Sequence, residues 1–536
     1  MPCFQYPLQQ AQHAPAVPEA AAQQAPAQPA EQCGCACSCG KRSQEPPPLF
    51  VDDDFPARWH VLHDPSLAAA WLRPHEIRQE PRLFVEDCSR FAVQQGCLSD
   101  GWFIAACAAV AERPHLLRQI VPEGQVLFGP GYDGSVRFRL WHLGEWVEVR
   151  VDDRLPVDAH GVPVYARCQH KDEFWLPLLE KAFAKFHKNY IFLDEKYEYS
   201  LAEGLINLTG YCIESPRLHK WNANAVFDLL MGFSDKDALM LCKTDLPGPG
   251  LPGYHAYTVT KVFHHPLDKS KCSECEEELR LVRVRNPWGT SVEWNGAWKD
   301  GDERWNKLSK QIKDAMEYKD EEDGEFWMDI KDFIANFSDV CCATERPTEA
   351  MNMKMIGQVT GHWSEDDESG GHPDEMEKFA KNPQFLMVAL GGISPEEEEK
   401  LQKEKKKPKK KTDKCDKKEE NGEQEEPFNP LAGMEAVVEL LQEHNRKKRT
   451  HKYGISFFIF ETCAERRLTA EQLLQLTYVA GAAELRYENG VRAAVRLHPG
   501  RRYVVIPATE HAGQEGHFLL RVFSRHARVR LSPLPP

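Results

Sequence analysis

Three short stretches of the sequence carry side chains whose types and spacing could act on a peptide bond. Residues 95–103 read Gln-Gly-Cys-Leu-Ser-Asp-Gly-Trp-Phe and run into an alanine-rich apolar segment. His255 opens a predicted strand after a Gly/Pro turn, and Asn286 ends another, two residues before Trp288. A thiol protease uses a histidine to hold a proton, an asparagine to orient that imidazole and a donor such as Gln95 to stabilise an oxyanion. The chain order of these residues therefore indicates a cysteine-protease type of site.

The position that should carry the nucleophile is occupied by Gly101. A reactive cysteine is expected at the start of the helix that follows Asp100, because the helix dipole lowers the thiol pKa there. We expect Asp100 to cap this helix. Glycine has no side chain, so no covalent acyl-enzyme can form, and a site without its nucleophile keeps only about 10³ to 10⁴ of acceleration over water. The sequence therefore predicts a protease-like site that keeps its histidine and asparagine but cannot cleave a peptide bond.

Cys97 is the nearby thiol that could replace the missing one. It precedes Gly101 by four residues, in the loop rather than at the helix start, which favours an inert side chain. Cys107 lies about 240° around the helix from Gly101 and is expected in the core. A displaced nucleophile at Cys97 is the alternative that would make the chain an active endopeptidase.

Two further cysteine groups invite a chemical interpretation. The alternating cysteines from Cys33 to Cys39 are compatible with S-acylation, with metal binding or with no defined role. Cys272 and Cys275, with His264 and His265, imitate a zinc site, but their acidic neighbours argue against one. The 17 cysteines are odd in number and no export signal precedes them, which favours free thiols in a cytoplasmic protein.

Composition excludes several classes of function. The net charge of −15 argues against nucleic acid as a partner, because a phosphate backbone requires a basic face. The longest apolar run, residues 102–111, is about half the length that spans a bilayer. With 42% hydrophobic and 28% charged residues, the chain resembles an ordinary globular protein.

The order of patterns along the chain predicts several regions. Residues 1–48 form an Ala/Gln/Pro/Cys-rich arm that we expect to be disordered. Residues 49–345 form a globular core in two lobes, about 49–215 and 216–345, helical first and then rich in strands, with a polar loop from His264 to Glu278. Residues 346–527 have the alternation of an antiparallel β-sandwich, interrupted by a charged insert at 396–426, and 528–536 form a tail. The fold class is α+β.

These stretches resemble the calpain family of the papain-like cysteine proteases. Residues 95–102 match its signature Q-G-x-L-G-D-C-W, with Ser99 for the glycine and Gly101 for the cysteine. Residues 173–185 and 323–328 are also similar, as are 361–363, 382–384, 504–507 and 516–521 in the sandwich. The resemblance covers about residues 49–524 and implies a two-lobed protease core followed by the C2-like sandwich called domain III. The chain resembles an inactive calpain such as the calpain-C type, and we expect it to lack the EF-hand domain found in some calpains.

The resemblance also implies calcium binding, unevenly in the two lobes. In the second lobe the matching positions are acidic, and carboxylate oxygens suit this hard cation; they are Glu293, Asp300, Asp323 and Glu325. In the first lobe Asp87, Arg90 and Glu180 match, but Ala92 replaces an aspartate, so we expect a weak or empty site. An acidic loop in the sandwich is a further candidate for calcium or lobe contacts: Glu365, Asp366, Asp367, Glu368, Asp374, Glu375 and Glu377.

The function expected from the sequence is that of a pseudoprotease. Such a protein would act by calcium-modulated binding of protein partners or calpain-type substrates. One alternative is an active calcium-dependent cysteine endopeptidase. The other is a calcium- or lipid-binding scaffold, which would reach a membrane surface through the sandwich or the N-terminal cysteines.

Overall fold

A computed structural model describes residues 48–536, apart from 86–88, 195–200, 217, 219–220, 267–277, 290–291, 348–352, 365–368, 391–432, 444–452, 488 and 526. Residues 48–536 form one compact unit. The predictions for Cys33 to Cys39, Asp87, Cys272, Cys275, residues 365–368 and the charged insert at 396–426 lie outside the described residues.

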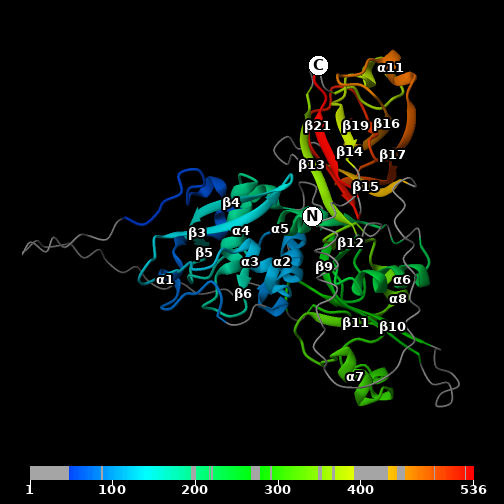
Figure 1. Cartoon of the computed structure of the whole chain (residues 1–536). Helices are drawn as coiled ribbons and strands as arrows, with labels where there is room; N and C mark the ends of the chain where they lie inside the picture. Colours follow the sequence, from blue (N-terminus) through cyan, green and yellow to red (C-terminus); the bar gives the residue numbers. More distant parts are fainter. Residues whose placement is uncertain are drawn as a thin grey trace, which may run out of the picture. The chain divides into compact units, whose positions relative to one another are not determined.

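The first lobe is built around helix α2, Gly101–Ala111, whose residues are all buried. An apolar, alanine-rich sequence favours this arrangement, because a helix that is apolar on every side must be surrounded by protein. Figure 1 shows α2 beside β9 of the second lobe, where Thr258 donates a hydrogen bond of 2.8 Å to the Ala105 carbonyl. The other elements of this lobe are α1 (Pro74–Ile77), α3 (Pro114–Ile120), α4 (Trp175–Phe186), α5 (Leu201–Thr209), β1 (Ala70–Leu72), β2 (Val93–Gln94), β3 (Ser135–His142), β4 (Glu145–Asp152), β5 (Leu155–Val157) and β6 (Arg167–Cys168).

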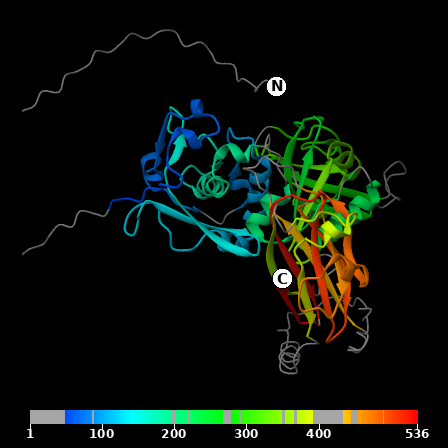
Figure 2. The same cartoon turned by 90° about the horizontal axis from the view of Figure 1, so that it is seen from above.

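The second lobe is an antiparallel sheet with six strands in the described residues, in the order β11-β10-β9-β8-β12-β7. These strands are β7 (Cys212–Glu214), β8 (Leu239–Thr244), β9 (His255–Pro266), β10 (Glu278–Arg285), β11 (Glu325–Asp329) and β12 (Asp339–Thr344). Helices α6 (Ala223–Ser234), α7 (Lys310–Met316) and α8 (Ile330–Asn336) accompany them. Figure 2 shows the first lobe, blue to cyan, beside the second, in green.

Two details differ from the sequence prediction. His264 and His265 belong to β9, opposite Arg280 and Leu279 of β10, rather than to a polar loop. Strand β7 lies in the first segment of the core by sequence, yet it pairs with β12 at the edge of the second-lobe sheet. The polar alternation near His264 resembled a loop because these outer residues of the ladder are partly exposed.

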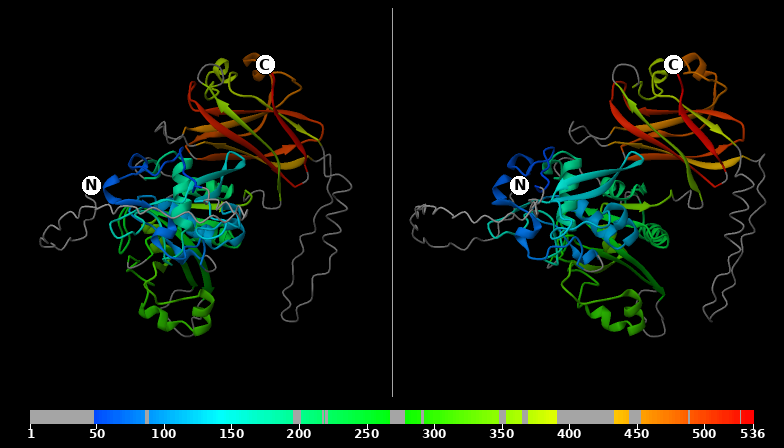
Figure 3. Two further views of the ribbon diagram at one scale, coloured as in Figure 1. Left: turned by 90° about the vertical axis from the view of Figure 1, so that its left-hand side faces the viewer. Right: turned by 60° about the vertical axis from the view of Figure 1, so that its left-hand side comes forward.

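The C-terminal domain is the predicted β-sandwich, whose layers Figure 3 shows in yellow to red. Among the described residues, one sheet has the order β13-β20-β15-β18 and the other β17-β16-β19-β14-β21. The strands are β13 (Lys354–Trp363), β14 (Phe385–Ala389), β15 (Met434–Gln442), β16 (Ile455–Glu461), β17 (Thr477–Arg486), β18 (Gly490–Leu497), β19 (Arg502–Thr509), β20 (Gly516–Ser524) and β21 (Val529–Pro533), with helices α9 (Met376–Phe379) and α11 (Ala470–Leu474). Inward side chains such as Trp363, Phe457 and Phe518 form its core.

The end of the chain is part of the sandwich rather than a tail. Strand β21 pairs with β14, with Phe385 opposite Pro533. The sequence signal was weak here because β21 is partly or fully exposed along its length. The sandwich in turn contacts the protease core, since Leu441 and Leu519 belong to the apolar cluster built around α2.

Candidate functional site

His255 and Asn286 are brought together by adjacent strands of the second lobe. His255 is the first residue of β9, and Asn286 follows the last residue of β10. The two side chains are buried, and His255 Nε2 lies 2.8 Å from Asn286 Oδ1. The amide is oriented because its Nδ2 donates to the Val292 carbonyl, while the Trp288 N–H donates to its oxygen. The imidazole is thereby held in the geometry of a cysteine-protease histidine.

The buried environment makes His255 a neutral imidazole. Burial lowers the pKa of His255 to about 4, and the hydrogen bond with Asn286 opposes this shift only in part. Trp288 lies beside the ring, with centroids 4.5 Å apart, and Tyr257 meets it edge-on at 4.8 Å. An apolar lining of this kind would strengthen the pairing of an imidazolium with a thiolate, were a thiolate present.

Gly101 faces His255 from the N-terminus of α2 in the other lobe. A Cβ atom added to Gly101 would lie 3.5 Å from His255 Cε1 and 3.0 Å from Gln95 Oε1. The structure thus brings Gly101, His255 and Asn286 together. A side chain at position 101 would point at the imidazole, but glycine supplies none.

Gln95 does not present the predicted donor to this position. Its Nε2 donates to the Leu98 carbonyl at 2.7 Å, which leaves Oε1 as the amide atom nearest to Gly101. This oxygen is buried and has no hydrogen-bond partner among the described residues. An oxyanion needs a donor, so the amide would have to turn before Gln95 could stabilise one.

Thr244, which no motif in the sequence singles out, supports the backbone of His255. The His255 N–H donates to Thr244 Oγ1 at 3.2 Å, and that hydroxyl donates to the Pro252 carbonyl at 2.7 Å. Thr244 is buried at the end of β8. A threonine at a strand end is too common for the sequence alone to single it out.

Asp100 and Glu180 form a buried carboxyl pair behind the site. Asp100 makes no side-chain capping bond to α2, contrary to the prediction. Burial, with the neighbouring Asp100 carboxylate, raises the pKa of Glu180 well above its ordinary value. The Glu180 carboxyl also accepts the Ala166 N–H at about 3.0 Å. The role of Glu180 as a first-lobe calcium ligand stays a prediction, and it would require these oxygens to give up the Ala166 N–H inside the core.

Three carboxylates of the predicted second-lobe calcium set influence one another. Burial, with the charge of Glu293, raises the pKa of Asp300 to about 7. Burial, and the charge of Asp323, raise the pKa of Glu293 as well. Asp300 Oδ1 is buried without a hydrogen-bond partner in the described part of the chain. Mutual repulsion of this kind fits residues that would bind a hard cation. However, no three acidic, histidine or cysteine side chains in the described residues are close enough together to hold a metal ion.

Glu325, the fourth residue of that predicted set, joins the two lobes instead. Arg90 of the first lobe donates to its two oxygens at 2.6 and 2.9 Å, and Arg283 lies 3.3 Å away. Burial opposes ionisation, but the Arg90 hydrogen bonds and the Arg283 charge lower the pKa of Glu325. The side chain is thus neutralised by two guanidinium groups.

The remaining predicted positions have unremarkable surroundings. Cys97 is exposed and Cys107 is buried, as expected. Asp374 and Glu375 of the sandwich loop are exposed and lie near His372 and Lys378, respectively. In the described residues, no helix has the length and apolar character needed to cross a membrane.

The fold and the site define a class of protein. A histidine and an asparagine on neighbouring strands of one lobe face a helix N-terminus in the other, which is the arrangement of the papain-like cysteine proteases. Residues 50–344 match the model of the calpain family cysteine proteases, and residues 359–523 match that of domain III of the calpain large subunit. The chain belongs to the calpain family.

Individual relatives agree with this assignment. The chain is 36% identical over 516 residues to Calpain-12 of Homo sapiens, covering 90% of this chain and 68% of that one. It is 32% identical over 507 residues to Calpain of Schistosoma mansoni, covering 90% and 61%, respectively. For Calpain-A of Drosophila melanogaster the identity is 30% over 499 residues, covering 89% and 55%. The chain thus spans between about half and two thirds of the length of these relatives.

Proposed function

We propose that the chain is a catalytically inactive calpain-family protein that binds calpain-type protein segments in its cleft without cleaving them. One observation carries this proposal: Gly101 faces a correctly oriented His255–Asn286 pair but has no atom that could attack a carbonyl. The Gln95 amide, which turns its acceptor toward the same point, supports it further.

Calcium would modulate this binding through the second lobe. Glu293, Asp300 and Asp323 would have to move closer together to hold the cation, whose charge would then relieve the repulsion that raises their pKa values. Their loop is joined to the site, because the Asn286 N–H donates to the Gly324 carbonyl at 2.8 Å and the Gly324 N–H donates to Glu293 at 2.7 Å. A cation there would stiffen the support of Asn286.

The test compares casein cleavage in calcium by the unmodified chain and by Gly101→Cys. We expect no cleavage by the first and measurable, calcium-dependent cleavage by the second, because the new Cβ faces the imidazole. Gly101→Ala is the matched control, since it adds the Cβ without the sulfur and should stay inactive. Binding of a fluorescent casein peptide to the unmodified chain, measured by anisotropy, should strengthen with calcium.

The same cleavage experiment can instead show that the chain is an active endopeptidase. Cys97 is exposed and could react with an electrophile irrespective of catalysis. Iodoacetamide labelling with peptide mapping should therefore show labelling of Cys97 that does not depend on His255. Casein cleavage by the unmodified chain that disappears in both Cys97→Ser and His255→Ala would overturn the proposal.

A further inference from the structure

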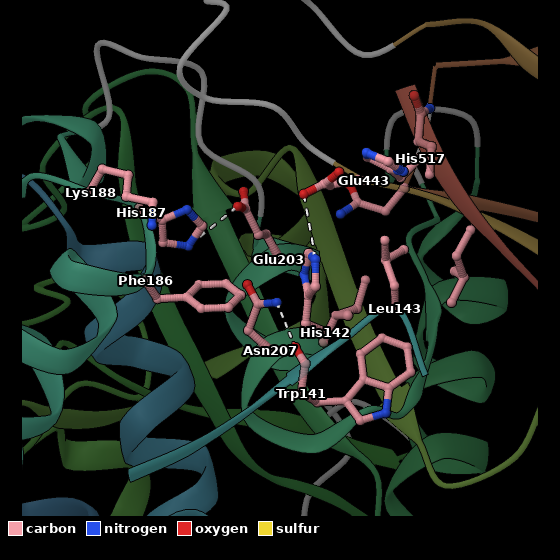
Figure 4. A pocket seen from close by; sticks show the side chains of 14 residues that line it. Trp141, His142, Leu143, Phe186, His187, Lys188, Glu203, Asn207, Glu443 and His517 are labelled. Atoms are coloured by element: carbon pink, nitrogen blue, oxygen red, sulfur yellow. Dashed lines mark hydrogen bonds and ion pairs between the residues drawn. The ribbon is translucent and has the colours of Figure 1, made fainter. Parts of the chain in front are cut away.

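A cavity lies between the first lobe and the sandwich. It has a volume of about 330 Å³. Its walls come from the end of β3, the end of α4, helix α5, the end of β15 and strand β20. Figure 4 shows the polar side chains that line it, among them His142, His187, Glu203, Asn207, Glu443 and His517.

Asn207 turns an unsatisfied acceptor into this cavity. Its Nδ2 donates to the Trp141 carbonyl at 3.0 Å, which determines the orientation of the amide. Asn207 is only 8% exposed. Its Oδ1 is buried and has no hydrogen-bond partner among the described residues. Buried polar atoms in native proteins are normally satisfied. The orphan oxygen therefore indicates a missing donor.

Glu203 lies one helical turn before Asn207, so the two side chains share a face of α5. Glu203 is 5% exposed, and its carboxylate is 3.8 Å from His187 Nε2. Nearer the opening, His142 Nε2 and Glu443 are 3.6 Å apart, and both are partly exposed. The inner end of the cavity thus combines a carboxylate with a free amide oxygen, and a second carboxylate lies near its opening.

We propose that this cavity binds a small organic cation through a primary ammonium or guanidinium group. Such a group carries several donors and a positive charge, which match Asn207 Oδ1 and the Glu203 carboxylate. An anion would meet two carboxylates, and among the described lining residues the exposed Lys188 supplies the one permanent positive charge. Because Glu203 belongs to the protease core and Glu443 to the sandwich, a cation with two charged ends would bridge the domains.

The test is calorimetric titration of the full chain with agmatine near neutral pH at constant ionic strength. We expect saturable binding of one molecule and a higher Tm with ligand. Asn207→Leu and Glu203→Gln should each weaken binding by roughly tenfold or more, since charge-assisted hydrogen bonds are lost. Glu484→Gln is the control, because Glu484 is a highly exposed carboxylate on β17, which does not line the cavity.

Glu443→Gln keeps the test decisive if the α5 variants do not fold. This partly exposed residue at the opening can be changed without disturbing the core, and binding should again weaken severalfold. A short peptide with one arginine, titrated in parallel, distinguishes a protein side chain from a free small molecule as the natural source.

Three results would overturn the proposal. The first is no saturable heat with agmatine, which would mean that water alone satisfies Asn207. The second is an unchanged Kd in the Asn207, Glu203 and Glu443 variants, which would place the cation elsewhere. The third is saturable binding of inorganic phosphate that depends on the same residues, since the cavity would then select anions.

Discussion

Arg90 and Glu325, 235 positions apart in the chain, are joined by two hydrogen bonds of 2.6 and 2.9 Å across the two lobes. Arg90 also pairs with Glu112 at 2.9 Å, and Arg283 lies beside Glu325, so four charged groups form one partly buried network. The network lies where first-lobe residues meet the acidic loop of the second lobe. It therefore contributes to holding Gly101 opposite His255.

We expect Glu325→Gln to lower the free energy of unfolding by about 2–4 kcal/mol, because Arg90 and Arg283 lose the buried carboxylate that they share and keep only Glu112 and Glu317 as acidic partners in the described part of the chain. Urea unfolding measures this value. Glu435→Gln is the control: Glu435 and Arg496 are mostly exposed, and that pair should contribute less than about 1 kcal/mol. Equal losses of unfolding free energy in the two variants would show that the network between the lobes stabilises the chain no more than an exposed ion pair does.

The stability of the calcium-free chain should depend on pH through Asp300. Its pKa is raised to about 7 in the folded state, so the folded chain binds more protons than the unfolded chain between about pH 4 and 7. Stability should therefore fall as the pH rises through this window, by roughly 1–2 kcal/mol once partial exposure is allowed for. Urea unfolding with a chelator measures the slope.

Asp300→Asn should remove that slope and also weaken stabilisation by calcium at neutral pH. Both effects have one cause, since the substitution removes the charge that repels Glu293 and would attract the cation. A slope that persists unchanged in Asp300→Asn would mean that another group titrates in this range.

His255 should produce the opposite dependence at lower pH. Its pKa is lowered to about 4, so the unfolded chain binds the extra proton between about pH 6.5 and 4. Stability should be lost as the pH falls through this window, by up to about 3 kcal/mol. His255→Leu should reduce this loss, whereas substitution of the exposed His115 should leave it unchanged. An imidazole that titrates near 6.5 by NMR would contradict the burial argument.

Substitutions of Glu180 test whether this residue has a structural role or binds calcium. Glu180→Gln should cost less than about 1 kcal/mol, because an amide can still donate to Asp100 and accept from Ala166. Glu180→Leu should cost about 2–4 kcal/mol, because it leaves a buried carboxyl and a buried N–H unpaired. Calcium affinity, measured by titration, should be the same in Glu180→Gln as in the unmodified chain. A large loss of affinity would identify Glu180 as a ligand.

The strands of the sandwich differ in how clearly their local sequence indicates a strand. β16 lies within the region whose alternation predicts the sandwich, and its buried residues form an apolar run. β13 and β21 give weak local signals because they are largely exposed and contain glycine, histidine or proline. Their strand character comes from pairing with β20 and β14, and no local pattern records a pairing partner.

The sequence by itself determined the covalent chemistry: position 101 has no sulfur, whatever the chain folds into, and three motifs in order define the family. Only the tertiary structure decided that Glu180 is buried beside Asp100, that Glu325 is neutralised by Arg90, and that Gln95 turns its oxygen to Gly101. The reason is physical. The charge state of a side chain and the orientation of an amide depend on neighbours that packing brings from distant parts of the chain. Those neighbours are not adjacent in sequence to the residue that they affect.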